Sequence, residues 1–200
     1  MKTNKKAYLC TKTHNNEPYN TVYMIEEKTI IQVLAEQKEY VESYQPNKWV
    51  DRCEEQMFEL NSPLAQVVIG VRRSGKSTLC HKVLLKHRVT YGYANFDDDR
   101  LAHLHVEDLN TVLSCIYQIY GSDIQYIFLD EIQDVEGWHL FVNRLLRSDL
   151  HVVVTGSNAK LLSGELATHL TGRYNEIHLF PFSFREYCNF HNIAINGITT

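Results

Sequence analysis

The sequence predicts an α/β protein in which helices cover both faces of a parallel sheet. Two observations carry this prediction. Strand-like and helix-like segments alternate five times from residue 65 onward, which is the order that parallel strands joined by helical crossovers require. Most of the strand-like segments are also rich in apolar residues, without the alternating polar positions of a half-exposed strand. A chain of 200 residues with 44% hydrophobic and 22% charged residues has the composition of an ordinary globular domain.

The region before the sheet is predicted to be polar at first and then helical. Residues 1–25 are polar and show no clear period, so we expect them to be loosely ordered. The stretches KTIIQVLAEQKEYVESY at 28–44 and KWVDRCEEQMFEL at 48–60 each gather apolar residues on one helical face. Pro46 separates the two predicted helices, and NSP at 61–63 marks a turn before the first strand.

The core follows as alternating strands and helices. The predicted strands are AQVVIG (65–70), VTYGYANF (89–96), IQYIFLD (124–130), LHVVVTG (150–156) and NEIHLF (175–180). The predicted helices are STLCHKVLLKH (77–87), VEDLNTVLSCIYQIY (106–120), WHLFVNRLLR (138–147), NAKLLSGELATHL (158–170) and SFREYCNF (183–190). Gly121 is expected to stop the second helix, and Ser183 with Glu186 has the spacing of a capping box at the start of the last one.

Residues 67–78, VVIGVRRSGKST, place a phosphate-binding pattern between a predicted strand and a predicted helix. They fit GxxxxGK[ST], in which backbone N–H groups and the helix N-terminus surround phosphate oxygens. We expect Lys76 to reach the β and γ phosphates of a nucleotide and Ser77 to bind Mg²⁺. The alternative is a chance glycine-rich turn, which the flanking strand and helix make the weaker interpretation. The expected nucleotide-binding residues are Gly70, Arg73, Ser74, Gly75, Lys76, Ser77 and Thr78.

A second candidate site lies where the strand at 124–130 ends. The sequence YIFLDE places Asp130 and Glu131 there, and a carboxylate at the end of a buried strand can accept hydrogen bonds from the water shell of Mg²⁺. Glu131 is predicted to polarise a water molecule for attack on the γ phosphate. P-loop GTPases and small-molecule kinases usually lack a glutamate at this position, whereas ATP-hydrolysing proteins usually have it. The alternative is an acidic cap of the strand end.

Two further positions are candidates for catalysis. The strand at 150–156 continues into TGSN, where Ser157, with Asn158 as its substitute, is predicted to contact the γ phosphate or the attacking water. The same four residues also suit a turn and a helix N-cap. Arg173 in TGRY precedes the last strand, and an arginine supplied across a subunit interface can accelerate phosphoryl transfer by about 10³- to 10⁵-fold. A surface arginine in a turn is the alternative.

The motifs together resemble the AAA-type ATPase family of bacteria and archaea known as AAA domain 14. The resemblance covers residues 65–187 and implies a three-layer P-loop NTPase core with the five-stranded parallel sheet ordered 5-1-4-3-2. It supports the roles given to Lys76, Ser77, Asp130 and Glu131, and it strengthens the role given to Arg173. The segments that carry it are GVRRSGKSTL, NFDDDR, YIFLDEIQDVEGW, VVVTGSNAKLLSGELATHLTGRY and LFPFSFREY.

The chain departs from the family pattern in two places. Members often have proline where this chain has Asp99, and they usually continue into a helical lid and a further C-terminal domain. We therefore expect a fragment of a longer protein whose turnover is impaired by loss of the lid's arginine. The predicted organisation is a polar N-terminal segment (1–25), a helical extension (26–63), a P-loop ATPase core (64–182) and the beginning of a lid or C-terminal region (183–200).

The predicted function is Mg²⁺-dependent binding and hydrolysis of ATP. ATP is preferred over GTP because no NKxD-type sequence follows the fourth strand. A nucleotide-binding switch with negligible turnover is one alternative. A small-molecule kinase with Asp97 or Asp98 as its base is a weaker one, because acidic runs such as NFDDDR are usually solvated loop or helix-start charges. Expected partners are ATP or ADP, further copies of the chain, and a protein or nucleic-acid client that the sequence does not identify.

Charge, hydropathy and cysteine content indicate which partners and which cellular location to expect. The net charge of −4 predicts no global attraction to nucleic acid or to anionic membranes. No apolar run approaches the 18 residues that a membrane-spanning helix needs, and the N-terminus has no run of signal-peptide type. Five widely spaced cysteines without a CxxC pair fit reduced intracellular thiols better than disulfides or a zinc site. We expect a cytoplasmic protein without a membrane anchor.

Overall fold

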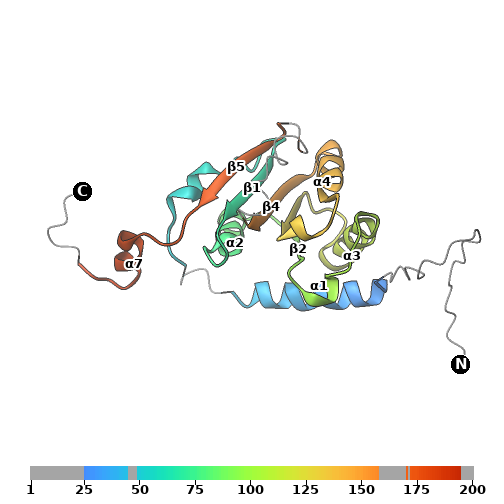
Figure 1. Cartoon of the computed structure of the whole chain (residues 1–200), viewed down its shortest axis with the longest axis horizontal. Coiled ribbons are helices and arrows are strands. Elements are labelled where there is room, and N and C mark those ends of the chain that lie inside the picture. The colour runs from blue at the N-terminus through green and yellow to red at the C-terminus, as the bar shows by residue number, and fades with distance from the viewer. Residues whose placement is uncertain (1–24, 45–48, 158–169, 171, 195–200) are drawn as a thin grey trace, which may run out of the picture.

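The computed structural model describes residues 25–44, 49–157, 170 and 172–194. Within these residues, five parallel strands form one sheet in the order β2-β3-β4-β1-β5 (Figure 1). Read from the other edge, this is the predicted order 5-1-4-3-2, so the expected α/β fold and sheet order are confirmed. The strands are β1 (Ala65–Gly70), β2 (Tyr91–Asn95), β3 (Tyr126–Asp130), β4 (His151–Ser157) and β5 (Tyr174–Leu179).

Helices alternate with these strands and agree closely with the sequence periodicity. The helices are α1 (Glu27–Glu42), α2 (Lys76–Lys86), α3 (Leu109–Tyr120), α4 (Trp138–Arg147) and α7 (Phe184–Phe190). Short 3-10 helices are η2 (Cys53–Met57), η3 (Asp99–Leu101), η4 (Val106–Asp108) and η5 (Ile132–Asp134). The polar segment predicted at 1–25 and the helix predicted at 158–170 lie almost wholly outside the described residues. Among the helices that are described, none is long and apolar enough to cross a lipid bilayer.

Both faces of the sheet are covered, which explains why the inner strands β1, β3 and β4 are largely apolar without alternation, whereas the edge strand β5 is partly polar. Successive strand residues point to opposite faces. Val68 and Phe128 belong to one apolar cluster, which includes the buried side of α2. Val67 and Ile127 belong to the other, which includes buried residues of α1, α3 and α4. The molecule has three layers, with the sheet between two layers of helices. Because the strands are parallel, their carboxyl ends lie on the same side of the molecule (Figure 1).

Signals at the ends of two helices are also confirmed. Helix α3 ends at Tyr120, and Gly121 follows with φ 99°, a backbone conformation that favours glycine. At the start of α7, Ser183 Oγ accepts a hydrogen bond from Glu186 N at 3.3 Å. In return, Glu186 Oε2 accepts one from Ser183 N at 2.7 Å, which completes the predicted capping box.

The helix predicted at 48–60 is wrong. This stretch contains the five-residue 3-10 helix η2, and Arg52 before it is extended with φ −117° and ψ 138°. Tertiary contacts override the helical pattern here. Lys82 of α2 donates to the backbone oxygen of Val50 at 3.0 Å and to Glu55 Oε1 at 2.6 Å. These contacts hold the backbone on both sides of Arg52 against α2. A regular helix over 48–60 would not follow this path.

A buried histidine in α2 makes the stability of the fold depend on pH. His81 is fully buried, its Nδ1 atom lies 2.8 Å from the hydroxyl of Tyr91, and aromatic rings surround it. Burial lowers the pKa of His81 from 6.5 to about 3, so the folded protein keeps this ring neutral at mildly acidic pH. The unfolded chain takes up the proton below pH 6.5. The stability that the neutral ring provides is complete above pH 6.5 and is lost as the pH falls toward 3.

We therefore expect His81→Phe to weaken the acid sensitivity of folding. Between pH 7 and pH 5, the wild type should lose about 2 kcal/mol more of its unfolding free energy than the variant does. Urea unfolding of both proteins at the two pH values measures this difference. The comparison is between pH values for each protein, so a constant cost of the substitution cancels. Equal losses for the two proteins would contradict the assignment of His81 as a neutral core residue.

Candidate functional site

The loop between β1 and α2, residues 70–76, has the backbone of a phosphate-binding loop. Gly75 has φ 93°, where a residue with a side chain would be strained. Gly70 lies against the end of β5, so a Cβ atom there would be 2.3 Å from the backbone oxygen of Leu179. The two glycines of the motif are thus required for separate reasons, one by its dihedral angle and the other by close packing. Arg73 also has a positive φ, 66°, which is uncommon for a residue with a side chain.

Lys76, the first residue of α2, sits inside this loop with only 4% of its surface exposed. Its ammonium group donates to the backbone oxygens of Gly70 at 3.3 Å and Val71 at 3.4 Å. The same Nζ atom lies 3.2 Å from Glu131 Oε1, so the charges of the two motifs form an ion pair. A buried ammonium requires such partners, and an arriving phosphate can replace Glu131 among them.

Asp130 at the end of β3 is buried and accepts three hydrogen bonds. Ser77 Oγ donates to its Oδ1 atom at 3.0 Å, and the hydroxyl of Tyr93 donates to Oδ2 at 2.9 Å. The hydroxyl of Thr155, on β4, donates to Oδ1 as well. Burial raises the pKa of Asp130 above its usual value, although the three hydrogen bonds oppose this shift. Burial and the Asp130 charge raise the pKa of Tyr93, so its hydroxyl stays a proton donor.

These groups fit a hard divalent cation such as Mg²⁺. The hydroxyl of Ser77 and the carboxylate of Asp130 are oxygen ligands, 3.0 Å apart and directed at each other. Among the described residues, no three His, Cys, Asp or Glu side chains cluster tightly enough to hold a metal alone. Mg²⁺ usually keeps several waters and is shared between a few protein oxygens and substrate phosphates, so one hydroxyl and one carboxylate suffice.

Glu131 is oriented by the strand next to its own. It has φ 55°, which turns the chain at the end of β3, and its N–H donates to Thr155 Oγ1 at 3.1 Å. Gln133 Nε2 donates to Glu131 Oε2 at 2.8 Å. Thr155 therefore connects the carboxylate of Asp130 and the backbone of Glu131 to β4. Thr155 is the first residue of TGSN, and its sequence context does not predict this contact.

A polar cavity of about 400 Å³ collects most of the residues predicted for the reaction. Ser157 lies on its wall at the end of β4, and its substitute Asn158 lies outside the described residues. Because parallel strands end on the same side of the sheet, the last residues of β2, β3 and β4 all line this space, together with residues of the loop that follows β1. Its lining includes Arg72, Arg73, Ser77, Asp97, Asp130, Glu131, Asp134 and Ser157.

Arg173 lies where the strands begin, at the end of the sheet opposite to the phosphate loop. It precedes β5, and its backbone oxygen accepts a hydrogen bond from the N–H of Ala65, the first residue of β1. The phosphate loop begins at the other end of β1, five residues on, which is roughly 17 Å along a strand. The structure therefore does not bring Arg173 to the polar cavity of its own chain.

A second cavity, of about 410 Å³, touches the other side of the phosphate loop. We call it the apolar cavity. Its lining combines loop and α2 residues with two segments that the sequence analysis did not connect to the site, residues 50–52 and 181–182. Residues 50–52 carry no motif, and residues 181–182 belong to LFPFSFREY, which carries the family resemblance but does not by itself point to the site. The lining residues are Val50, Arg52, Arg73, Ser74, Gly75, Thr78, Leu79, Lys82, Pro181 and Phe182.

Helix α1 also contributes to the site, through Gln37. Gln37 Nε2 donates to the backbone oxygen of Asn95 at 2.9 Å, and the N–H of Asn95 donates to Gln37 Oε1 at 2.9 Å. Asn95 pairs in register with Asp130 on the neighbouring strand. The side chain of Gln37 thus caps the edge of β2 beside the buried carboxylate. No motif marks this residue in the sequence.

The acidic run NFDDDR has mainly local partners. Asp98 accepts a hydrogen bond from the N–H of Arg100 at 3.0 Å and so caps η3. Its carboxylate also forms an ion pair with the guanidinium of Arg100 at 2.8 Å. Asp97 forms an exposed ion pair with Arg72 at 3.1 Å. These contacts are those of helix-start and surface charges.

Comparison with known proteins places the chain in a family. The sequence matches a protein family described as AAA domain (AAA_14) over residues 62–188. It is 37% identical over 131 residues to an uncharacterized protein of Methanocaldococcus jannaschii, covering 65% of this chain and 29% of that protein. It is 40% identical over 139 residues to an uncharacterized protein of Haemophilus influenzae, covering 64% of this chain and 34% of that protein. The chain thus spans about a third of the length of these curated relatives.

Solved structures with a similar course of the chain were also found. A crystal structure of a DNA replication initiation factor has a TM-score of 0.44 and 17% identity, covering 82% of this chain and 53% of that one. AMPPCP-bound DnaA from Aquifex aeolicus has a TM-score of 0.47 and 15% identity, covering 87% of this chain and 59% of that one.

Proposed function

Since this chain belongs to the AAA domain family AAA_14, we propose that it binds ATP together with Mg²⁺ and hydrolyses it. One observation carries the proposal. The hydroxyl of Ser77, in the phosphate loop, donates to the carboxylate of Asp130 at 3.0 Å. Two motifs that are far apart in the sequence thus meet where a metal-bound triphosphate would need them.

In the proposed mechanism, the phosphate loop and Lys76 hold the triphosphate. The triphosphate displaces Glu131 from Lys76, and Glu131 then accepts a hydrogen bond from the water that attacks the γ phosphate. Mg²⁺, when bound through Ser77 and the water shell held by Asp130, offsets negative charge on the phosphate oxygens. Gln133 and Thr155 keep Glu131 directed toward the polar cavity. Ser157 on the same wall is the proposed contact for the γ phosphate or the attacking water.

The nucleoside is proposed to bind in the apolar cavity. Two cavities adjoin the phosphate loop, and they differ in chemistry. The polar cavity carries the carboxylates of Asp130 and Glu131, which suit a metal ion and water better than a nucleobase. The apolar cavity offers Val50, Leu79 and the ring of Phe182 to the flat faces of a purine. The triphosphate would then extend from one cavity to the other through the loop.

The position of Arg173 favours an assembly of several chains. An arginine at the far edge of the sheet can act on phosphate only in the site of a neighbouring copy, so we propose that hydrolysis requires a homo-oligomer. The domain limits at residues 26, 64 and 183 remain part of the proposal, as do the cytoplasmic location and a protein or nucleic-acid client. The activity of the longer relatives, of which this chain spans about a third, is proposed to include this ATPase step.

A nucleotide-binding switch is the second candidate. One contact and one position favour it: Lys76 holds Glu131 at 3.2 Å, and Arg173 is remote from the site of its own chain. A switch should bind ATP and ADP but release no phosphate at any protein concentration. Hydrolysis in an assembly should instead rise per chain as the concentration increases. A small-molecule kinase would instead transfer the phosphate to an added acceptor; of its two candidate bases, Asp98 is paired with Arg100, whereas Asp97 lines the polar cavity.

Lys76→Ala should abolish most nucleotide binding. The substitution removes the one ammonium group buried in the loop, which corresponds to about a 10- to 100-fold loss of affinity for ATP. Isothermal titration calorimetry with Mg²⁺ measures the affinity directly. Lys28→Ala, at an exposed lysine of α1, is the matched control and should bind like the wild type. Folded wild type that shows no heat with ATP or with ADP would overturn the proposed function.

A further inference from the structure

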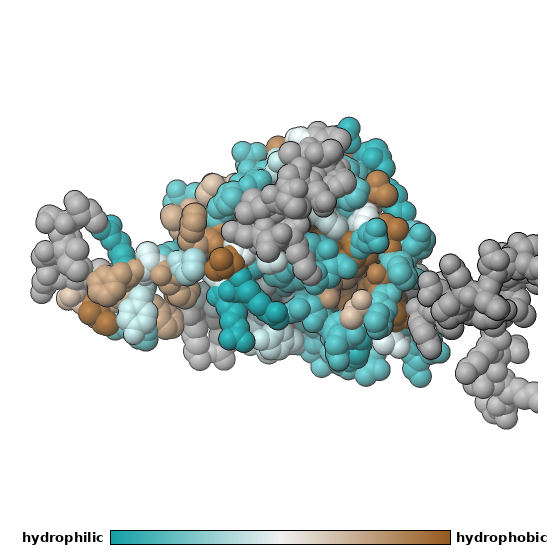
Figure 2. All heavy atoms as spheres, viewed as in Figure 1, coloured by the Kyte–Doolittle hydropathy of each residue, from teal (hydrophilic) through white to brown (hydrophobic). Residues whose placement is uncertain are grey.

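The chain after β5 forms an arm that extends away from the sheet. We call residues 180–194 the C-terminal arm; it contains α7, which lies at one end of the molecule in Figure 1. Hydrophobic residues are visible on its surface in Figure 2. Cys188, 1% exposed, is the buried residue of α7. The large exposed apolar residues of the arm are Phe180, Phe182, Phe184, Tyr187, Phe190 and Ile193.

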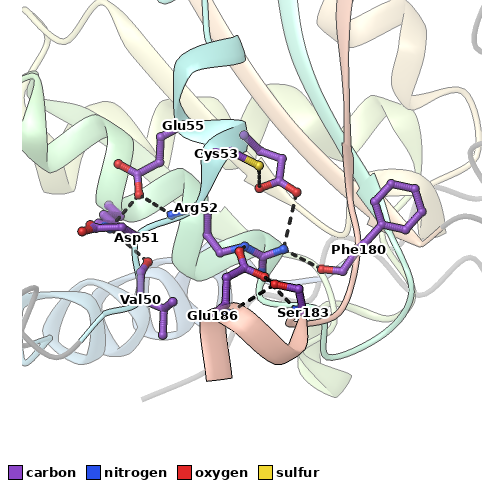
Figure 3. Close-up of polar contacts among 10 residues, drawn as sticks. Val50, Asp51, Arg52, Cys53, Glu55, Phe180, Ser183 and Glu186 are labelled. Atoms are coloured by element: carbon purple, nitrogen blue, oxygen red, sulfur yellow. Dashed lines mark hydrogen bonds and ion pairs between the residues drawn. The ribbon is translucent and has the colours of Figure 1, made fainter. Parts of the chain in front are cut away.

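Arg52 attaches this arm to the rest of the molecule (Figure 3). Its guanidinium donates to the backbone oxygen of Phe180 at 2.7 Å and forms an ion pair with Glu186 at 2.8 Å. It also lies over the ring of Phe182, 4.9 Å from the ring centre. The side chain of Arg52 is only 6% exposed, so these contacts are shielded from water and worth more than surface pairs. Burial tends to raise the pKa of Glu186, but hydrogen bonds from Ser183 and the Arg52 charge hold it below its usual value.

Arg52 is itself tied to the helix that begins in the phosphate loop. Lys82 of α2 contacts Val50 and Glu55 on either side of Arg52, and Lys86 lies 3.2 Å from Glu55 Oε2. The N–H of Arg52 donates to Glu55 Oε1 at 3.0 Å (Figure 3). The attachment of the arm therefore rests on a segment that α2 holds in place.

The apolar cavity lies between these two parts. Val50 and Arg52 line it from the side fixed to α2, and Pro181 and Phe182 line it from the arm. A nucleoside between the two walls would contact both, and it would therefore bind more tightly when the arm is attached. A ligand that prefers one of two arrangements shifts the protein toward it, and the effect is reciprocal.

We propose that Arg52 is a positioning residue that couples filling of the apolar cavity by a nucleoside to attachment of the C-terminal arm. The inference rests on the proposed binding of ATP and adds a consequence for the arm. The triphosphate alone, held by the phosphate loop, touches only one wall and does not favour attachment. Breaking the contact between Arg52 and Glu186 should weaken binding of the nucleoside part, although Glu186 does not line the cavity.

The first test compares ATP with inorganic tripolyphosphate. Glu186→Gln removes the charge that faces Arg52 but keeps the capping box, because glutamine can accept the hydrogen bond from Ser183 N. By calorimetry on the whole chain, this variant should bind ATP about 5-fold more weakly or worse, with unchanged affinity for tripolyphosphate. Glu42→Gln, in an exposed pair with Lys38, is the matched control and should leave both affinities unchanged. An ATP affinity equal to wild type, or an equal loss for both ligands, overturns the proposal.

A second variant separates positioning from general structural damage. Phe182→Ala removes the arm's wall of the apolar cavity, so it should also weaken ATP and spare tripolyphosphate. Adding Glu186→Gln to Phe182→Ala should then have little further effect, because the wall that Arg52 positions is already gone. Fully additive losses of ATP affinity would show that Glu186 acts independently of this wall and would overturn the coupling.

The thiol of Cys188, the buried residue of α7, serves as the reporter of the arm. Alkylation by iodoacetamide, followed by mass spectrometry, gives a rate for each thiol. ATP should slow modification of Cys188 in the wild type several-fold, and tripolyphosphate should not. In Glu186→Gln, Cys188 should react faster and gain little protection from ATP. Cys80 and Cys115 are buried in the core and report global unfolding, so their rates should not change between the two proteins.

The outcomes keep the two proposals apart. If neither ATP nor tripolyphosphate binds the wild type, the proposed function fails. If both bind and ATP leaves the rate of Cys188 modification unchanged, the proposed function stands and the coupling through Arg52 is overturned.

Discussion

Glu131→Gln is expected to bind ATP at least as tightly as the wild type and to release phosphate about 10²- to 10⁴-fold more slowly. The amide cannot accept a proton from the attacking water, so the chemical step loses its general base. Binding should not weaken, because Glu131 competes with the triphosphate for Lys76, 3.2 Å away. Removal of the negative charge leaves Lys76 free for phosphate. The opposite signs of the two effects make this substitution more informative than one that only reduces activity.

Calorimetry and a phosphate-release assay on the same preparation measure the two quantities. Glu136→Gln, an exposed glutamate in the same loop, makes the same chemical change outside the polar cavity and should behave like the wild type. Phosphate release that survives in Glu131→Gln would remove Glu131 from the role of base. Loss of ATP binding in this variant would show that the carboxylate supports the loop instead of competing for Lys76.

Most of the fold could be predicted because burial on both faces leaves a strong signal in the sequence. AQVVIG and YIFLD are mostly apolar, with Gln66 and Asp130 as their clearly polar residues, and the structure confirms them as inner strands of a parallel sheet. The helix predicted at 48–60 failed because contacts of Glu55 with Lys82 and Lys86, on another element, fix an irregular backbone that the apolar pattern does not reveal. A periodic pattern does not distinguish a helix from an irregular segment that packs through ion pairs.

The residues of the candidate site also fall into those that the sequence could predict and those that it could not. Residues within a motif could be predicted, since Lys76, Ser77 and Asp130 each need a particular chemistry at a particular spacing, and they lie together in the structure. Their roles stay predictions until the variants are measured. The wall residue Phe182 and the edge contact Gln37 could not be predicted, because ordinary packing residues gain a function only from what the fold places beside them.

Arg173→Ala should lower phosphate release by about 10³-fold or more while leaving ATP binding by each chain unchanged. The reason is its position. Arg173 precedes β5 at the amino edge of the sheet, whereas Gly70 and the phosphate loop lie at the carboxyl edge. The arginine cannot reach its own site, so its removal matters only to a neighbour. Arg147→Ala, at an exposed arginine at the end of α4, is the matched control.

Mixing two inactive variants tests the position of the arginine itself. An Arg173→Ala chain keeps an intact Glu131, and a Glu131→Gln chain keeps an intact Arg173. If the arginine acts across an interface, mixed assemblies contain some sites with both groups, and phosphate release should return to a measurable fraction of wild type. Activity per chain should also rise with protein concentration. Mixtures as inactive as their components, or a wild-type rate per chain that is independent of concentration, would assign Arg173 to the surface of a turn.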